Sequence, residues 1–99
     1  MTTMSEDPGA RLKRMTMRSW RRGTKEMDLI LGPFADARLA GMGAATLELY
    51  DALLAENDQD IYPWITGAAP VPGRFAGLIA EIASFARSRP AAGGGGGAA

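Results

Sequence analysis

Short segments with helical hydrophobic spacing, separated by glycine and proline, limit the fold of this chain more than any other feature. In residues 74–88 the large apolar side chains recur at intervals of three and four, which places them on one face of a helix. The chain has only six β-branched aliphatic residues, one valine and five isoleucines, so strands are disfavoured. We therefore expect an all-α fold, a small bundle of four to five short helices in a single domain.

Five segments carry the helical pattern. They are residues 11–21, 25–39, 44–56, 60–66 and 74–88. We expect Gly32-Pro33 to kink or break the second segment, because proline removes a backbone donor and clashes with the preceding turn. Pro63 favours a late start of the fourth segment, near Asp60, since proline fits the first turn of a helix.

Glycine and capping residues mark the ends of these segments. Gly23 and Gly67 are expected to end helices, because glycine adopts left-handed backbone conformations without a Cβ penalty. Thr24 is the expected N-cap of the second helix. Residues 1–10 and the Ala/Gly-rich residues 90–99 carry no apolar face and are expected to be disordered, which leaves residues 11–89 as the domain.

The absence of cysteine and histidine from the whole chain excludes much catalytic chemistry. No disulfide, thiolate metal site or thiol nucleophile can form, and the commonest metal ligand and general base are missing. Asp58 and Asp60 are assigned to helix capping and first-turn charge rather than to paired acid catalysis. We therefore expect no enzyme activity, no catalytic residue, no metal site and no stably bound cofactor.

No run of the chain approaches the roughly 18 apolar residues that a membrane span needs. The first ten residues resemble neither a signal peptide nor a mitochondrial presequence. A soluble protein that stays in the compartment where it is made is therefore expected.

The net charge of zero hides a strong asymmetry along the chain. Residues 11–25 carry +7 and residues 26–60 carry −7. Arg11, Arg14, Arg18 and Arg21 recur at intervals of three and four, so they line one helix face. Such a face can contact nucleic-acid phosphates, meet an acidic protein surface or simply be solvated. The acidic stretch makes a nucleic-acid partner unlikely, since it would repel phosphates.

A motif follows the basic segment, Arg22-Gly23-Thr24-Lys25-Glu26, of the form RGxxE. It lies within RLKRMTMRSWRRGTKEMDLILGPF and is followed by LLAENDQDIYPWITG. Over residues 11–88 this arrangement resembles the SdhE family of succinate dehydrogenase assembly factors, the bacterial relatives of mitochondrial succinate dehydrogenase assembly factor 2, and above all its alphaproteobacterial branch. Pro63 and the glycine-rich tail depart from the family pattern.

The resemblance implies a five-helix, monomeric chaperone that binds the flavoprotein subunit of succinate dehydrogenase and promotes covalent attachment of FAD. It leaves fumarate reductase open as a second client. FAD would be delivered to or held by the partner flavoprotein, and the location would be the bacterial cytoplasm. The expected partner-binding residues are Arg22, Gly23, Glu26, Asp28, Arg18 and Arg21.

The motif residues have a physical account in either of two forms. In one, the Arg22 guanidinium offers its donors to a partner carboxylate, Gly23 lets another backbone approach, and Glu26 orients Arg22 or binds a partner cation. In the other, Gly23 only ends a helix, and Arg22 and Glu26 form an exposed ion pair. The alternative function is a small helical nucleic-acid-binding or antitoxin-like regulator that uses the basic first helix.

Overall fold

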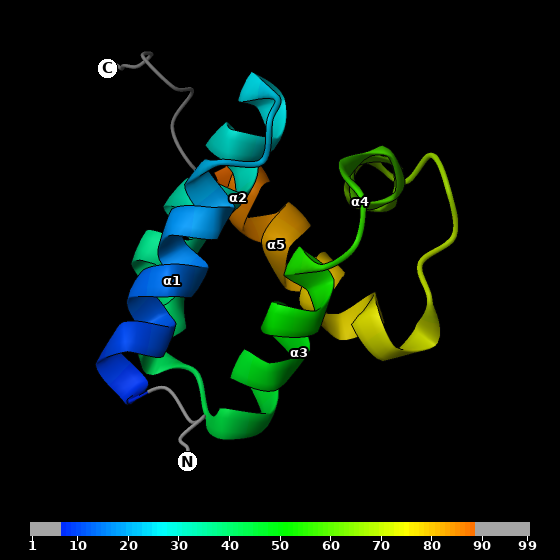
Figure 1. Ribbon diagram of the computed structural model, residues 1–99. Coiled ribbons are helices and arrows are strands. Elements are labelled where there is room, and N and C mark those ends of the chain that lie inside the picture. The colour runs from blue at the N-terminus through cyan, green and yellow to red at the C-terminus, as the bar shows by residue number, and fades with distance from the viewer. Residues whose placement is uncertain (1–6, 89–99) are drawn as a thin grey trace.

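The computed structural model describes residues 7–88 and contains no strand in that range (Figure 1). It has five α-helices: α1 (Pro8–Trp20), α2 (Lys25–Arg38), α3 (Ala44–Leu54), α4 (Asp58–Thr66) and α5 (Ala76–Ser88). Two short 3-10 helices, η1 (Leu39–Gly41) and η2 (Gly73–Phe75), follow α2 and precede α5. The expected all-α bundle is confirmed.

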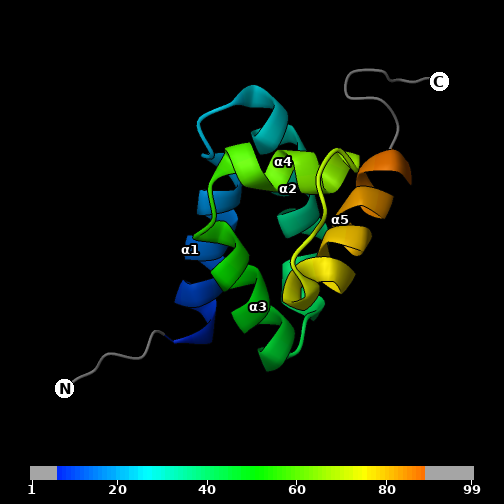
Figure 2. The ribbon, with the colours of Figure 1, turned by 90° about the vertical axis from the view of Figure 1, so that its right-hand side faces the viewer.

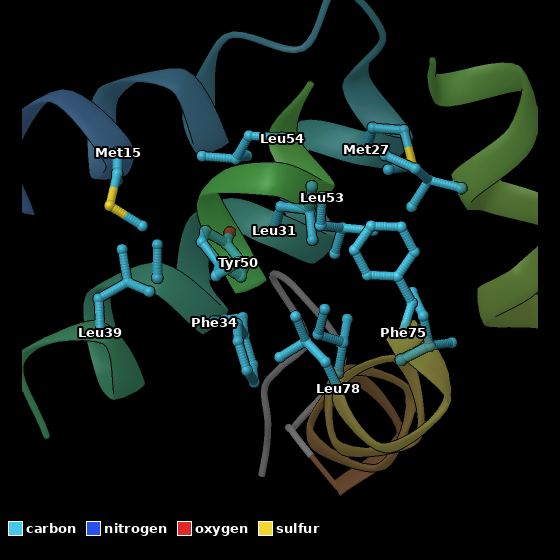
Figure 3. Packing of buried hydrophobic residues seen from close by; sticks show 14 residues of the cluster. Met15, Met27, Leu31, Phe34, Leu39, Tyr50, Leu53, Leu54, Phe75 and Leu78 are labelled. Carbon is cyan, nitrogen blue, oxygen red and sulfur yellow. The ribbon is translucent and has the colours of Figure 1, made fainter. Parts of the chain in front are cut away.

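All five helices contribute to a single hydrophobic core (Figure 3). One fully buried side chain from each helix illustrates this: Met15, Leu31, Tyr50, Ile61 and Ile82 are all 0% exposed. Figures 1 and 2 show α1 and α3 near one another on one side, with α5 across from α1 and α4 over one end. A core shared by every helix fits a chain too short to hold a second one.

Helices α1 and α2 pack closely because Gly32 has no side chain. A methyl group built at position 32 would overlap the indole ring of Trp20. The Trp20 Nε1–H also donates to Asp36 of α2, at 3.2 Å. Gly32 is therefore a packing position. Of the kink or break expected at Gly32-Pro33, the break is wrong, since α2 is one helix from Lys25 to Arg38.

Two helices begin earlier than expected. Helix α1 starts at Pro8, because the Asp7 carboxylate accepts hydrogen bonds from the amides of Gly9 and Ala10, at 2.8 and 3.2 Å. Residues 8–10 therefore belong to α1 and not to a disordered N-terminus. Helix α4 starts at Asp58, so that Pro63 lies inside it. The disorder expected for residues 1–6 and 90–99 concerns positions outside the described residues.

Candidate functional site

The loop between α1 and α2 lies beside the start of α4 at one end of the bundle (Figure 2). Its last residue, Thr24, caps α2 as expected: its hydroxyl oxygen accepts from the amide of Met27, at 3.3 Å. Gly23 has a φ of +103°, a backbone conformation that residues with a side chain rarely adopt. A Cβ atom built on Gly23 would have no other part of the described chain within 4 Å. Glycine is thus required by the backbone conformation, and the space beside it is open.

The guanidinium of Arg22 joins this loop to the connection between α3 and α4. Its Nε donates to Asp58 Oδ1 at 2.8 Å. Its Nη1 donates to the carbonyl of Leu54 at 2.7 Å, and its Nη2 to the carbonyl of Glu56 at 2.8 Å. Leu54 is the last residue of α3, where helix carbonyls lack partners within the helix, and Glu56 lies in the connection that follows. With only 8% of its side chain exposed, Arg22 acts as a clamp between two connections.

These contacts differ from both expected roles of Arg22. Its donors are directed into the chain, so its guanidinium is not a free fork for a partner carboxylate. The prediction of an exposed Arg22–Glu26 ion pair is also wrong, because Arg22 pairs with Asp58 instead. The carboxylate of Glu26 has no hydrogen-bond or ion-pair partner within residues 7–88. The sequence separation of 36 residues hides the Arg22–Asp58 pair from local pattern analysis.

Asp28 supports the same loop from the other side. Its Oδ1 accepts a hydrogen bond from the backbone amide of Arg22, at 2.6 Å. Asp28 therefore fixes the backbone of Arg22 while Asp58 fixes its side chain, and the two together define the path of the chain into Gly23.

The basic residues of α1 hold α3 as well. Arg14 donates through both terminal nitrogens to Asp51, at 3.1 and 2.9 Å, and this hydrogen bonding holds the pKa of Asp51 below its ordinary value. Arg18 donates to the carbonyl of Leu54, at 3.1 Å. Arg14, Arg18 and Arg22, four residues apart, thus contact α3 or the segment that follows it. Arg14 and Arg22 are ion-paired with Asp51 and Asp58, whereas Lys13, Arg18 and Arg21 stay exposed, so part of the basic surface expected for a nucleic-acid partner is neutralised within the chain.

Two adjoining depressions lie between the loop and α4. The first has a volume of about 240 Å³ and is lined by Thr24, Glu26, Met27, Asp58, Gln59 and Tyr62. The second, of about 330 Å³, shares three of these residues and reaches Arg22, Gly23, Glu56 and Asn57. We call the two together the α2–α4 hollow.

The six residues expected from the sequence fall into two groups around this hollow. Arg22 and Asp28 are committed to contacts within the chain that shape it, whereas Arg18 donates one hydrogen bond to the Leu54 carbonyl and is itself exposed. Gly23, Glu26 and Arg21 are exposed. Sequence reasoning missed Tyr62 and Gln59 as lining residues, and Asp58 as the partner of Arg22. The one sequence signal that pointed to these residues was the family likeness, which includes both the RGxxE segment and the segment ENDQDIYPW.

The described residues include no group of three or more side chains suited to bind a metal ion. Within residues 7–88, each helix is too short or too polar to span a bilayer.

A family model described as "Flavinator of succinate dehydrogenase" matches residues 13–86. Three curated proteins from Aspergillus terreus, Mycosarcoma maydis and Drosophila grimshawi are 46%, 39% and 36% identical to this chain over 68, 72 and 80 residues. The matches cover 69%, 73% and 79% of this chain but 23%, 30% and 54% of those relatives. The chain therefore spans about a quarter to a half of the length of the curated relatives it matches.

Each of these relatives is named "Succinate dehydrogenase assembly factor 2, mitochondrial". The expected bacterial, cytoplasmic location is therefore wrong, because these relatives are mitochondrial proteins of fungi and a fly. It rested on a likeness to the bacterial branch of the family. The family model covers most of the chain, including the RGxxE loop and the start of α4. This chain belongs to the succinate dehydrogenase flavinator family, the assembly factors of that enzyme.

Proposed function

We propose that this protein binds the flavoprotein subunit of succinate dehydrogenase and promotes covalent attachment of FAD to that subunit. Family membership supports the proposal, since the family is described as a flavinator of that enzyme. The structural observation that carries it is the clamped RGxxE loop: Arg22 holds the loop from inside, while Gly23 and Glu26 stay exposed beside an open hollow.

The proposed mechanism is positioning rather than chemistry by this chain. The chain has no histidine or cysteine, so the reacting groups would belong to the flavoprotein and its FAD. Binding of a rigid partner can hold such groups in a reactive geometry, and well-oriented reactions gain up to about 7–11 kcal/mol of their barrier in this way. The cofactor would therefore be held by the partner, with no stable site on this protein.

The site residues have two proposed roles, direct contact with the flavoprotein and support of the loop. Gly23, Glu26 and Arg21 contact the flavoprotein directly, because they are exposed at the loop. Arg22 and Asp28 act indirectly, because their polar groups are used to set the shape of the loop, whereas Arg18 is exposed on α1 and joins the direct contacts. A rigid loop binds more tightly than a mobile one, since less conformational entropy is lost on association.

Complementation tests the proposal. Cells that lack their own assembly factor are given this protein, and covalent flavin on the flavoprotein subunit is measured by its fluorescence in a denaturing gel. We expect the flavin band to return and the tagged protein to co-purify with the subunit. A folded, expressed protein that neither restores the band nor binds the subunit would contradict the proposal.

A further inference from the structure

The first depression of the α2–α4 hollow is lined by both apolar and acidic side chains. Met27, 1% exposed, comes from α2, and Tyr62, 41% exposed, comes from α4. Glu26 lines the same space. A half-exposed aromatic ring and an acidic side chain beside a buried thioether form a pocket that is apolar inside and negative at its edge.

The charges around this pocket do not cancel. Asp58 is neutralised by Arg22, whose Nε lies 2.8 Å from its Oδ1. Glu26 lines the pocket, is exposed and has no ion-pair partner among residues 7–88. Lys25 adjoins Glu26 in the sequence but does not line the pocket. The pocket therefore has a net negative charge.

The two helices that begin here do not make the pocket a site for an anion. Helix N-termini favour negative charge, but α2 and α4 already carry acidic residues in their first turns. Those residues are Glu26 and Asp28 in α2, and Asp58 and Asp60 in α4. A further anion would meet these carboxylates, whereas a cation would be attracted by them.

We propose that this pocket receives a lysine or arginine side chain of the flavoprotein partner, an inference that rests on the proposed function. The aliphatic stem would lie against Met27 and the ring of Tyr62, and the cationic group would face Glu26. Such a side chain buries its stem on apolar surface while its charge stays near water, and a cation can stack on a tyrosine ring. The volume of about 240 Å³ equals roughly eight water molecules at about 30 Å³ each, enough for one long side chain.

The test is the affinity of this protein for the purified flavoprotein subunit, measured with four variants that change exposed positions. Glu26→Gln removes the charge and Tyr62→Ala removes the ring, whereas Tyr62→Phe keeps the ring. Glu48→Gln is the matched control, because Glu48 is an exposed acid on α3 without a partner within residues 7–88. Circular dichroism checks that each variant keeps its helices.

We expect Glu26→Gln and Tyr62→Ala each to weaken binding by about tenfold at low salt, while Glu48→Gln binds like the original protein. Tyr62→Phe should lose much less affinity than Tyr62→Ala, because it keeps the ring. The loss caused by Glu26→Gln should shrink at about 1 M salt, because exposed charges are then screened. A fifth variant that combines Glu26→Gln with Tyr62→Ala should lose less binding free energy than the sum of the two single losses, since both groups would contact one side chain.

Three results separate the inference from the proposed function. If the unchanged protein does not bind the subunit, the proposed function fails and the inference fails with it. If the unchanged protein binds and Glu26→Gln binds equally well, only the inference is overturned. A loss at Glu26 that is the same at every salt concentration, or is matched by Glu48→Gln, also overturns it.

Discussion

Arg22 and Asp58 form an ion pair that is largely buried, with Nε and Oδ1 2.8 Å apart and 8% and 14% of the two side chains exposed. The pair joins the RGxxE loop to the first residue of α4. Removal of one member of a buried pair leaves an uncompensated charge, which is more harmful than the loss of an exposed pair. The first and last residues of the motif, Arg22 and Glu26, should therefore behave differently when they are changed.

Arg22→Ala should lower the free energy of unfolding by about 3–5 kcal/mol, because it leaves Asp58 and the Glu56 carbonyl without the donors of Arg22. Glu26→Ala changes an exposed side chain without a partner in residues 7–88, so its effect should stay within about 0.5 kcal/mol. Urea unfolding followed by circular dichroism measures both. Equal destabilisation by the two variants would show that Arg22 is not the clamp.

Local patterns in the sequence were sufficient for most of the fold. The apolar residues Met15, Tyr50 and Ile82 are buried, because the helical spacing in the sequence gives each helix one apolar face. The helix end at Gly67 was also expected, and Gly67 is the C-cap of α4 with a positive φ. Gly23 has a positive φ too, but the expectation that it ends α1 is wrong, because α1 ends at Trp20 with Arg21 as its C-cap. What the sequence could not show is how distant residues pair: Arg22 with Asp58 depends on the path of the whole chain. The same is true of Gly32, whose role comes from the ring of Trp20 on another helix.

Gly23→Ala isolates the backbone requirement of the loop. Its φ of +103° is strained for any side chain, while space for the methyl group is open, so the variant should lose about 1–3 kcal/mol of stability. Gly41→Ala is the matched control, since Gly41 also has open space but no positive φ, and a change within about 0.5 kcal/mol is expected. Thermal unfolding compares the two. A Gly23→Ala protein as stable as its Gly41→Ala counterpart would rule out backbone strain at this loop.

Gly32→Ala should be destabilising by about 1–3 kcal/mol, because the added methyl group overlaps the Trp20 ring and α1 must shift. A helical glycine with open space provides the contrast: Gly77→Ala in α5 should be stabilising by about 0.5–1 kcal/mol. Tryptophan fluorescence during unfolding reports on both. The packing argument is contradicted if Gly32→Ala gains stability as Gly77→Ala does.

Stability should fall at high pH because of Tyr50. Its hydroxyl lies 2.6 Å from Ser19 Oγ, which itself donates to the carbonyl of Met15, so Tyr50 is the donor in that contact. Burial raises the pKa of Tyr50 from 10.0 to about 12. The stabilising effect of the neutral phenol is complete below the unfolded pKa of 10.0 and is lost as pH rises through about 12.

Tyr50→Phe tests this pH dependence. The variant should lose about 1 kcal/mol near neutral pH, where the original protein keeps its hydrogen bond to Ser19. As pH rises above about 10, the original protein should lose up to about 1.4 kcal/mol per pH unit from this group, and the variant should not. Urea unfolding at several pH values gives the two slopes. Parallel slopes in that range would show that Tyr50 does not titrate with unfolding.

Covalent flavin on the flavoprotein subunit, in cells that contain Gly23→Arg or Gly41→Arg in place of the original factor, tests the account most directly. Both positions have open space for a side chain, but only Gly23 lies in the RGxxE loop. We expect both variants to keep their helices, the Gly41→Arg protein to support full flavin attachment, and the Gly23→Arg protein to support almost none. Full flavin attachment with a folded Gly23→Arg protein would contradict the claim that this loop binds the flavoprotein.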